Sequence, residues 1–232
     1  MQYKHDTVFI QFIEFIEFDK VYTPAKEYNE YQRDWLCRRM NDSIEPYLNF
    51  IETIQQTKFP IDVKFGLEVC YIPESENILE NVLGEYNFDF LTGGVHWISG
   101  WGFDHPAQKE LWRSVNVNEI YKRYYSIMCN LCESGLFTGL AHPDSIKCFD
   151  YIPDIDLTDL YNELSLCINK HGMYAENSGG LRLNYSDDLE LGLNKKLLSL
   201  FKDNDVSILT ASDAHKQSDV GANIFELEKM LK

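Results

Sequence analysis

The chain has 232 residues, of which 44% are hydrophobic and 25% are charged, and its net charge is −16. These values are ordinary for a globular protein, and the length is sufficient to bury a substantial core. The chain has no run of about 18 apolar residues and no basic-then-apolar start, so we expect one soluble cytoplasmic domain over residues 1–232, with no membrane partner. The acidic charge repels phosphate backbones and argues against a nucleic-acid partner.

Apolar runs alternate with amphipathic segments along the chain. The expected strands, in chain order, cover residues 7–18, 63–70, 88–97, 137–143 and 173–175, with a last one beginning at 206. The expected helices cover residues 44–56, 77–83, 118–133, 157–170, 189–201 and 224–231. We interpret residues 24–41 as a loop or a short helix. Strands that alternate with helices predict parallel βα units and an α/β fold.

Polar groups follow the apolar strands in a repeated pattern. A carboxylate or an imidazole at the end of a buried strand is costly unless something binds it. The groups in this position are Glu68, His96, His142, Glu176 and the pair Asp213 and His215. In a closed (β/α) barrel every strand ends at the same face, so the barrel predicts that these side chains converge.

Some of these features also have simpler interpretations. Asp213 is equally well explained as the N-cap of a helix. Trp101 and Phe103, in a glycine-containing loop after His96, are expected either to form a pocket wall or to pack a surface loop. Arg182, on a glycine-rich turn, is either a fork for phosphate oxygens or a surface arginine.

The cysteines are expected to be free thiols, which agrees with a reducing compartment. Cys129 and Cys132 form a C-x-x-C motif, but it lies within a helical run. No second pair with zinc-ribbon spacing accompanies it, so we expect two buried helix cysteines in place of a redox or zinc site.

The chemistry of the strand-end groups points to a metal. Histidines together with carboxylates suit Zn²⁺, Mn²⁺ or Fe²⁺, and a carboxylate among histidines can bridge two ions. Such a site lowers the pKa of a bound water and neutralises charge on a transferring phosphoryl group. A small phosphorylated substrate is therefore the expected partner.

Five segments, in this order, carry a resemblance to a known family. They are G-L-E at 66–68, G-G-V-H-W-I at 93–98 with G-W-G-F-D at 100–104, A-H-P-D at 141–144, A-E-N-S-G-G-L-R at 175–182 and S-D-A-H at 212–215. Over residues 60–225 the chain resembles the PHP superfamily, and within it the monofunctional bacterial histidinol-phosphate phosphatases. The resemblance implies a distorted seven-stranded (β/α) barrel with a three-metal cluster. It implies that Glu68 bridges the first two metals, that His96 and His142 complete the second, and that Asp213 and His215 belong to the first and third.

The N-terminal part departs from the family pattern. The family opens with a strand ending in H-x-H, and this motif is absent from the sequence. A second family motif, Thr-Glu-His, is best matched at residues 12–15, where Phe15 stands at the histidine position. We therefore expect residues 1–45 to be divergent or truncated, the barrel to be incomplete on this side, and one to three divalent ions to bind. The resulting edge would be covered by residues 1–40 or by a second subunit in a homodimer.

The leading functional hypothesis is metal-dependent hydrolysis of a phosphomonoester, with L-histidinol phosphate as the substrate implied by the resemblance. The residues assigned to catalysis are Glu68, His96 and Asp213, and those assigned to metal binding are Glu68, His96, His142, Asp213 and His215. The residues assigned to substrate binding are Arg182, Trp101, Phe103 and Asn177. The alternative is a non-catalytic or weakly active metal- and phosphate-binding relative that has lost ligands of the first and third metals.

Overall fold

The computed structural model describes residues 7–12, 30–39 and 44–232. The strands are β1 (Thr7–Phe12), β2 (Asp62–Cys70), β3 (Phe90–Gly94), β4 (Trp97–Ile98), β5 (Trp101–Gly102), β6 (Gly139–Leu140), β7 (Tyr174–Ser178) and β8 (Ser207–Ala211). The α-helices are α1 (Glu30–Arg39), α2 (Glu45–Gln55), α3 (Glu76–Leu83), α4 (Val117–Glu133), α5 (Thr158–Lys170), α6 (Gly180–Asn184), α7 (Lys195–Asp203) and α8 (Ile224–Leu231).

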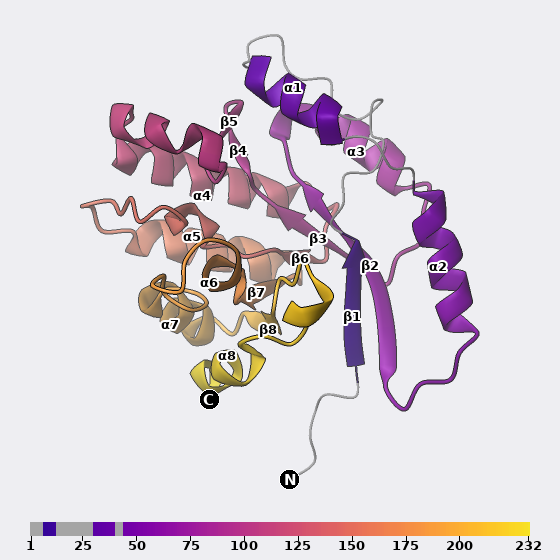
Figure 1. Cartoon of the computed structure of the whole chain (residues 1–232). Helices are drawn as coiled ribbons and strands as arrows, with labels where there is room; N and C mark the ends of the chain where they lie inside the picture. Colours follow the sequence, from indigo (N-terminus) through magenta and orange to yellow (C-terminus); the bar gives the residue numbers. More distant parts are fainter. Residues whose placement is uncertain (1–6, 13–29, 40–43) are drawn as a thin grey trace.

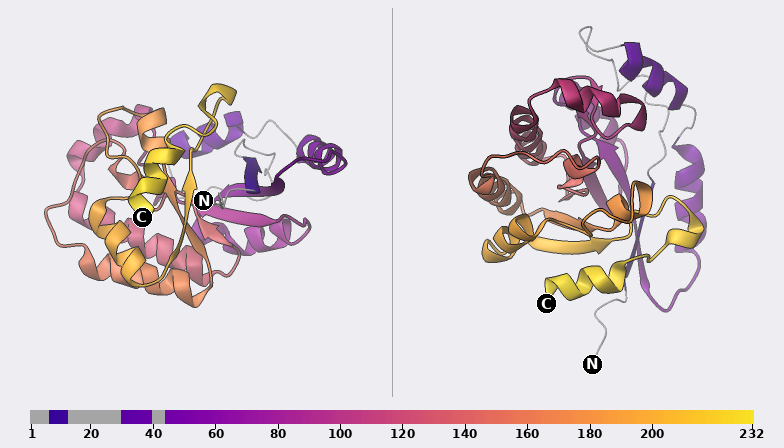
Figure 2. Two further views of the ribbon diagram at one scale, coloured as in Figure 1. Left: turned by 90° about the horizontal axis from the view of Figure 1, so that it is seen from below. Right: turned by 60° about the vertical axis from the view of Figure 1, so that its left-hand side comes forward.

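Six of the strands form one parallel sheet in the order β1-β2-β3-β6-β7-β8, which is their order along the chain. Because the order never reverses, each new strand is added on the same side, and the sheet curls as in part of a barrel (Figures 1 and 2). Helix α4 packs against α5 and α5 against α7 on the outside of this curl. The α/β class and a curled parallel sheet are as predicted, but this sheet has six strands in the described residues, where the family resemblance implied seven.

The strand-end loops depart from the predicted boundaries. The strand expected at 88–97 ends at Gly94, and the chain then forms the antiparallel hairpin β4–β5. The strand expected at 173–175 continues through Ser178. Residues 30–39 are helical, in agreement with the short helix that was one of the two alternatives expected at 24–41. Strand β1 ends at Phe12, so Glu14, Phe15 and Glu17 lie outside the described residues.

The two faces of the sheet differ because side chains alternate along each strand. On β2, Phe65, Leu67 and Val69 are buried in the apolar core, and Glu68 points to the opposite, inner face. Helix α2 is tied to the same strand by Tyr47, whose hydroxyl donates to the carbonyl of Gly66 at 2.9 Å. The inner face therefore receives the polar groups.

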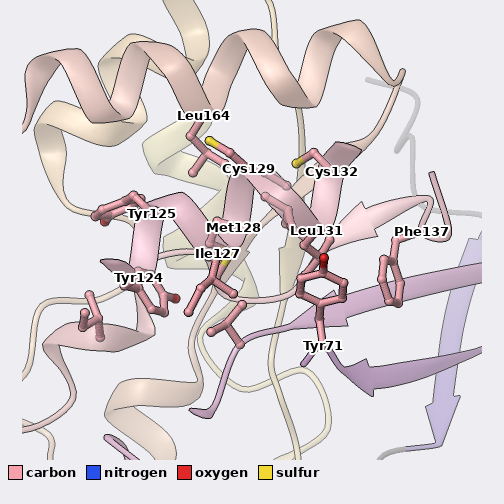
Figure 3. Close-up of a cluster of buried hydrophobic side chains, with 14 of the residues drawn as sticks. Tyr71, Tyr124, Tyr125, Ile127, Met128, Cys129, Leu131, Cys132, Phe137 and Leu164 are labelled. Carbon is pink, nitrogen blue, oxygen red and sulfur yellow. The ribbon is translucent and has the colours of Figure 1, made fainter. Parts of the chain in front are cut away.

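Helix α4 supplies much of the core on the outer side (Figure 3). Met128 and Leu131 are fully buried, and each such side chain contributes about 1.5–3 kcal/mol on burial. The ring of Tyr71 meets that of Phe137 edge-on beside this helix. Cys129 and Cys132 are free thiols buried on α4, as predicted.

Strands β1 and β8 form the two edges of the sheet in the part of the chain that the structure describes. The side chains of β8 are half-buried or exposed, in contrast to the buried ones at Ala175–Ser178 in β7. This agrees with the prediction of an incomplete barrel. No helix in the described ranges is both long and apolar enough to cross a membrane.

Candidate metal centre

Three predicted residues meet at the C-terminal ends of three neighbouring strands. Glu68 lies on β2, His96 follows β3, and His142 follows β6. Glu68 Oε1 is 3.0 Å from His142 Nε2 and 3.5 Å from His96 Nε2. Ligands bound at about 2.1 Å around a tetrahedral ion lie roughly 3.3 Å apart, so the three atoms have the spacing of a metal site. Within the described ranges, these residues form the one group of at least three His, Cys, Asp or Glu side chains with such spacing.

A glycine leaves the space in front of these atoms open. A Cβ atom added at Gly94 would lie 3.1 Å from His96 Nε2, 3.2 Å from Glu68 Oε1 and 3.5 Å from the His142 ring. The side chains of the same three residues therefore surround a position from which a side chain is missing. Two imidazoles and one carboxylate suit Zn²⁺, Mn²⁺ or Fe²⁺, and the residues present fit such an ion.

A second carboxylate holds one of the histidines. Asp104 Oδ2 lies 2.7 Å from His96 Nδ1, and only 6% of Asp104 is exposed. Asp104 was not among the predicted site residues. The motif G-W-G-F-D contained it, but its contact depends on the β4–β5 hairpin, which turns the chain back toward His96.

Electrostatics couple the three ligands. Burial by itself would raise the pKa of Glu68, but the charge of His142 and hydrogen bonds to both histidines outweigh it and hold that pKa well below its usual range. Burial opposes charging of His142, yet Glu68 raises the pKa of His142 to about 9. For His96 the same penalty is outweighed by Asp104 and Glu68, which raise its pKa well above 6.5.

Glu176 is a further buried carboxylate beside the centre. It lies on β7, is 5% exposed, and its Oε2 accepts from the backbone N–H of His142 at 3.3 Å. Burial and the negative charge of Glu68 raise the pKa of Glu176 to about 8. The sequence marked Glu176 as one of the converging strand-end groups but gave it no role in binding or catalysis.

Two strand-end residues have left-handed backbones. His142 has φ 28° and Asp213 has φ 52°. Such conformations are costly for residues with a Cβ and concentrate at functional sites, where the surrounding structure holds them.

Asp213 and His215 lie beside the triad and do not enter it. The carboxylate of Asp213 fits under Gly180, where an added Cβ would lie 1.9 Å from Oδ2. Burial raises the pKa of Asp213 even though His142 acts in the opposite direction. His215 is exposed, and its Nδ1 lies 3.2 Å from the backbone oxygen of Asp213. Their roles as metal ligands stay predictions.

Three of the residues predicted to bind substrate are packing residues. Asn177 is fully buried, with Oδ1 accepting from the N–H of Leu193 at 2.8 Å, because β7 continues through it and alternation turns it away from Glu176. Phe103 is fully buried beneath the hairpin against Tyr124. Trp101 is 8% exposed and packs on Trp112. For Trp101 and Phe103 this burial favours the alternative of a packed loop, and the substrate-binding roles of all three residues stay predictions.

Arg182 lies on α6, where its Nε donates to the carbonyl of Leu189 at 2.9 Å. A cavity of about 960 Å³ lies nearby, and its lining includes Asn184, Tyr185 and Lys147. The triad is not part of this lining. The two regions are linked by Asn184, which donates to the carbonyl of Asp213, and by Tyr185, which donates to that of Asp104. The cavity is therefore a neighbour of the metal centre and separate from it.

Metal binding at this centre is expected to strengthen as the pH rises. Below about pH 9 the His142 imidazole of the metal-free protein holds a proton, which an ion must displace before it binds the nitrogen. Apparent affinity should therefore rise about tenfold per pH unit for each proton released. Zn²⁺ titration against a chelator between about pH 6 and 7.5 measures this, and a pH-independent affinity would contradict it.

Comparison by sequence relates the chain to two named proteins. It is 26% identical over 204 residues to a "Probable histidinol-phosphatase" of Deinococcus radiodurans, covering 87% of this chain and 76% of that protein. It is 24% identical over 200 residues to a protein of the same name from Schizosaccharomyces pombe, covering 78% of this chain and 63% of that protein. The chain matches no family model.

Comparison by structure points the same way. The fold matches the crystal structure of HisK from Listeria monocytogenes, named as a histidinol phosphatase, with a TM-score of 0.69, 16% identity and coverage of 95% of this chain and 87% of that one. It also matches histidinol phosphate phosphatase of Lactococcus lactis, crystallised with zinc, L-histidinol and phosphate, with a TM-score of 0.60, 16% identity and coverage of 82% and 75%. By sequence the chain is therefore similar to two proteins named as probable histidinol-phosphatases, and it shares the fold of these two solved structures.

Proposed function

We propose that this protein is a metal-dependent phosphoesterase that hydrolyses L-histidinol phosphate to L-histidinol and phosphate on a PHP-type barrel. The observation that carries the proposal is the convergence of Glu68, His96 and His142 around the open position at Gly94. The sequence relatives named histidinol phosphatases, and the zinc, L-histidinol and phosphate bound to the L. lactis protein, support this substrate.

The roles of the chain's own groups follow from their geometry. Glu68, His96 and His142 would hold the ion, and Asp104 fixes the ring of His96. When bound, a divalent ion lowers the pKa of a coordinated water and offsets charge on phosphate oxygens. Arg182 is proposed to contact the phosphate through its terminal N–H groups, since only Nε is used by Leu189. Asp213 and His215 are proposed to complete the metal site from the β8 side.

Phosphate release from L-histidinol phosphate tests the proposal. We expect turnover with Zn²⁺, Mn²⁺ or Fe²⁺, loss of turnover on chelation, and recovery when the ion is restored. A simple aryl phosphate should be a poorer substrate if the site recognises the amino alcohol. Bound metal without turnover of any phosphomonoester would overturn the enzyme assignment.

The second candidate is a metal- and phosphate-binding protein with little or no catalysis. The observation in its favour is the position of His215, which is exposed and outside the triad, so that the described residues bring together only one group of three candidate ligands. Metal analysis separates the two. Two or three ions per chain favour the enzyme, and one ion without turnover favours the binding protein.

A further inference from the structure

We propose that Asp104 is a positioning residue that sets the orientation and tautomer of His96, and thereby the affinity of the metal centre. This inference rests on the proposed function, since it assigns a role within the same site. The relevant contact is the 2.7 Å separation between Asp104 Oδ2 and His96 Nδ1. No part of it requires Asp104 to touch the substrate or the ion.

The two ring nitrogens of His96 face different partners. Nδ1 meets Asp104, while Nε2 lies 3.5 Å from Glu68 Oε1 and 3.1 Å from the position of a Cβ on Gly94. An ionised carboxylate only accepts hydrogen bonds, so it favours a proton on Nδ1. In the neutral imidazole this leaves the lone pair on Nε2, which is the atom aimed at the metal position. A carboxylate behind a ligand histidine also makes the imidazole a stronger donor to the ion.

Asp104 is buried among groups that limit where its carboxylate can lie. Its backbone oxygen accepts from the Tyr185 hydroxyl at 3.2 Å, and its Oδ1 lies 3.6 Å from His105 Nε2. The ring of His105 lies 4.5 Å from that of Trp97 and 4.7 Å from that of Trp35 on α1. The β4–β5 hairpin and the packing of His105 against Trp35 therefore surround the carboxylate that contacts His96.

The competing explanation is purely structural, with Asp104 acting only as a buried partner that stabilises the loop. The variant Asp104→Asn separates the two explanations because it keeps the shape and removes the charge. Asp144→Asn is the matched control: Asp144 is 4% exposed, and its carboxylate bonds to Lys147, Asn194 and Tyr125 and not to the triad.

The measurements use the full chain and do not depend on activity. Zn²⁺ affinity is determined by competition with a chelator, and the tautomer of His96 is read from ¹⁵N chemical shifts of labelled histidine in metal-free protein at a pH high enough to keep the imidazole neutral. For D104N we expect Zn²⁺ binding weaker by about 10–100-fold and a shift of the proton away from Nδ1. For D144N we expect lower thermal stability with the His96 signals unchanged. Should D104N fail to fold, Asp104→Ser provides the same loss of charge with a smaller side chain.

A double-mutant cycle gives the decisive result. Because Asp104 is argued to act through His96, D104N should cost no further Zn²⁺ affinity in an H96Q background. Unchanged Zn²⁺ affinity and an unchanged His96 tautomer in D104N, or an equal loss in the H96Q background, would overturn the proposal. Zn²⁺ is the only probe, so this outcome is independent of whether L-histidinol phosphate is hydrolysed.

Discussion

Replacing Glu68 by glutamine is expected to abolish metal binding and to reduce phosphate release by at least about 100-fold. The reason is that Glu68 is the one carboxylate in the triad and lies within 3.5 Å of both histidine nitrogens. The glutamine amide keeps the shape of the Glu68 carboxylate but lacks the negative charge that attracts the ion and the protonated imidazoles. Loss of a supporting residue typically costs 10–100-fold in metal affinity or activity, and loss of a ligand should cost more.

Glu133→Gln is the control for this experiment. Glu133 is an exposed carboxylate at the end of α4 that pairs with Lys170 on α5. Exposed pairs of this kind contribute about 0–1 kcal/mol, so E133Q should bind Zn²⁺ as the wild type does. Both variants are compared by their metal content after dialysis and by their rate of phosphate release. An E68Q protein that retained its ion and its turnover would show that the triad is not the metal centre.

Gly94→Ala is expected to remove the metal while leaving the fold intact. The added methyl group would lie 3.1–3.5 Å from atoms of His96, Glu68 and His142 and would crowd an ion bound to them at about 2.1 Å. Gly94 does not have a left-handed backbone conformation, so alanine brings no φ penalty. The loss of Zn²⁺ binding should therefore be much larger than any loss of stability.

The adjacent residue provides a matched control on the other face of the same strand. A Cβ at Gly93 would lie 2.8 Å from Leu131 and 3.0 Å from Phe137, in the core under α4. Gly93→Ala should thus cost about 1–3 kcal/mol in unfolding free energy through overpacking, with Zn²⁺ affinity preserved in the folded fraction. Thermal unfolding and chelator competition on both variants measure the contrast. Equal effects of the two substitutions on Zn²⁺ binding would contradict the position of the site.

The sequence by itself determined the parallel α/β plan and the convergence of Glu68, His96 and His142. Both followed from one physical regularity, that parallel strands deliver their C-terminal ends to the same edge. Polar groups at those ends of apolar strands were therefore expected to lie close together. The burial of Cys129 and Cys132 was predictable for a similar reason, since their spacing belongs to one face of a helix.

The tertiary structure alone decided which neighbouring groups face the centre. Asn177 was assigned to the substrate and Glu176 was given no role, but β7 runs on to Ser178, and alternation then directs Glu176 inward and Asn177 into the packing. Which side chains of a strand face inward depends on its register, and a shift of one residue exchanges the two faces. The local sequence does not specify this register.

The contact between Asp104 and His96 was beyond sequence reasoning for a related cause. It joins residues eight positions apart through a hairpin in a segment where the end of a strand and a loop were expected. The same fold buries Phe103 and Trp101, which the sequence presented as pocket residues. Strand patterns report hydrophobicity and period, whereas the path of a loop depends on what packs against it, here Trp35 of α1 and Trp112.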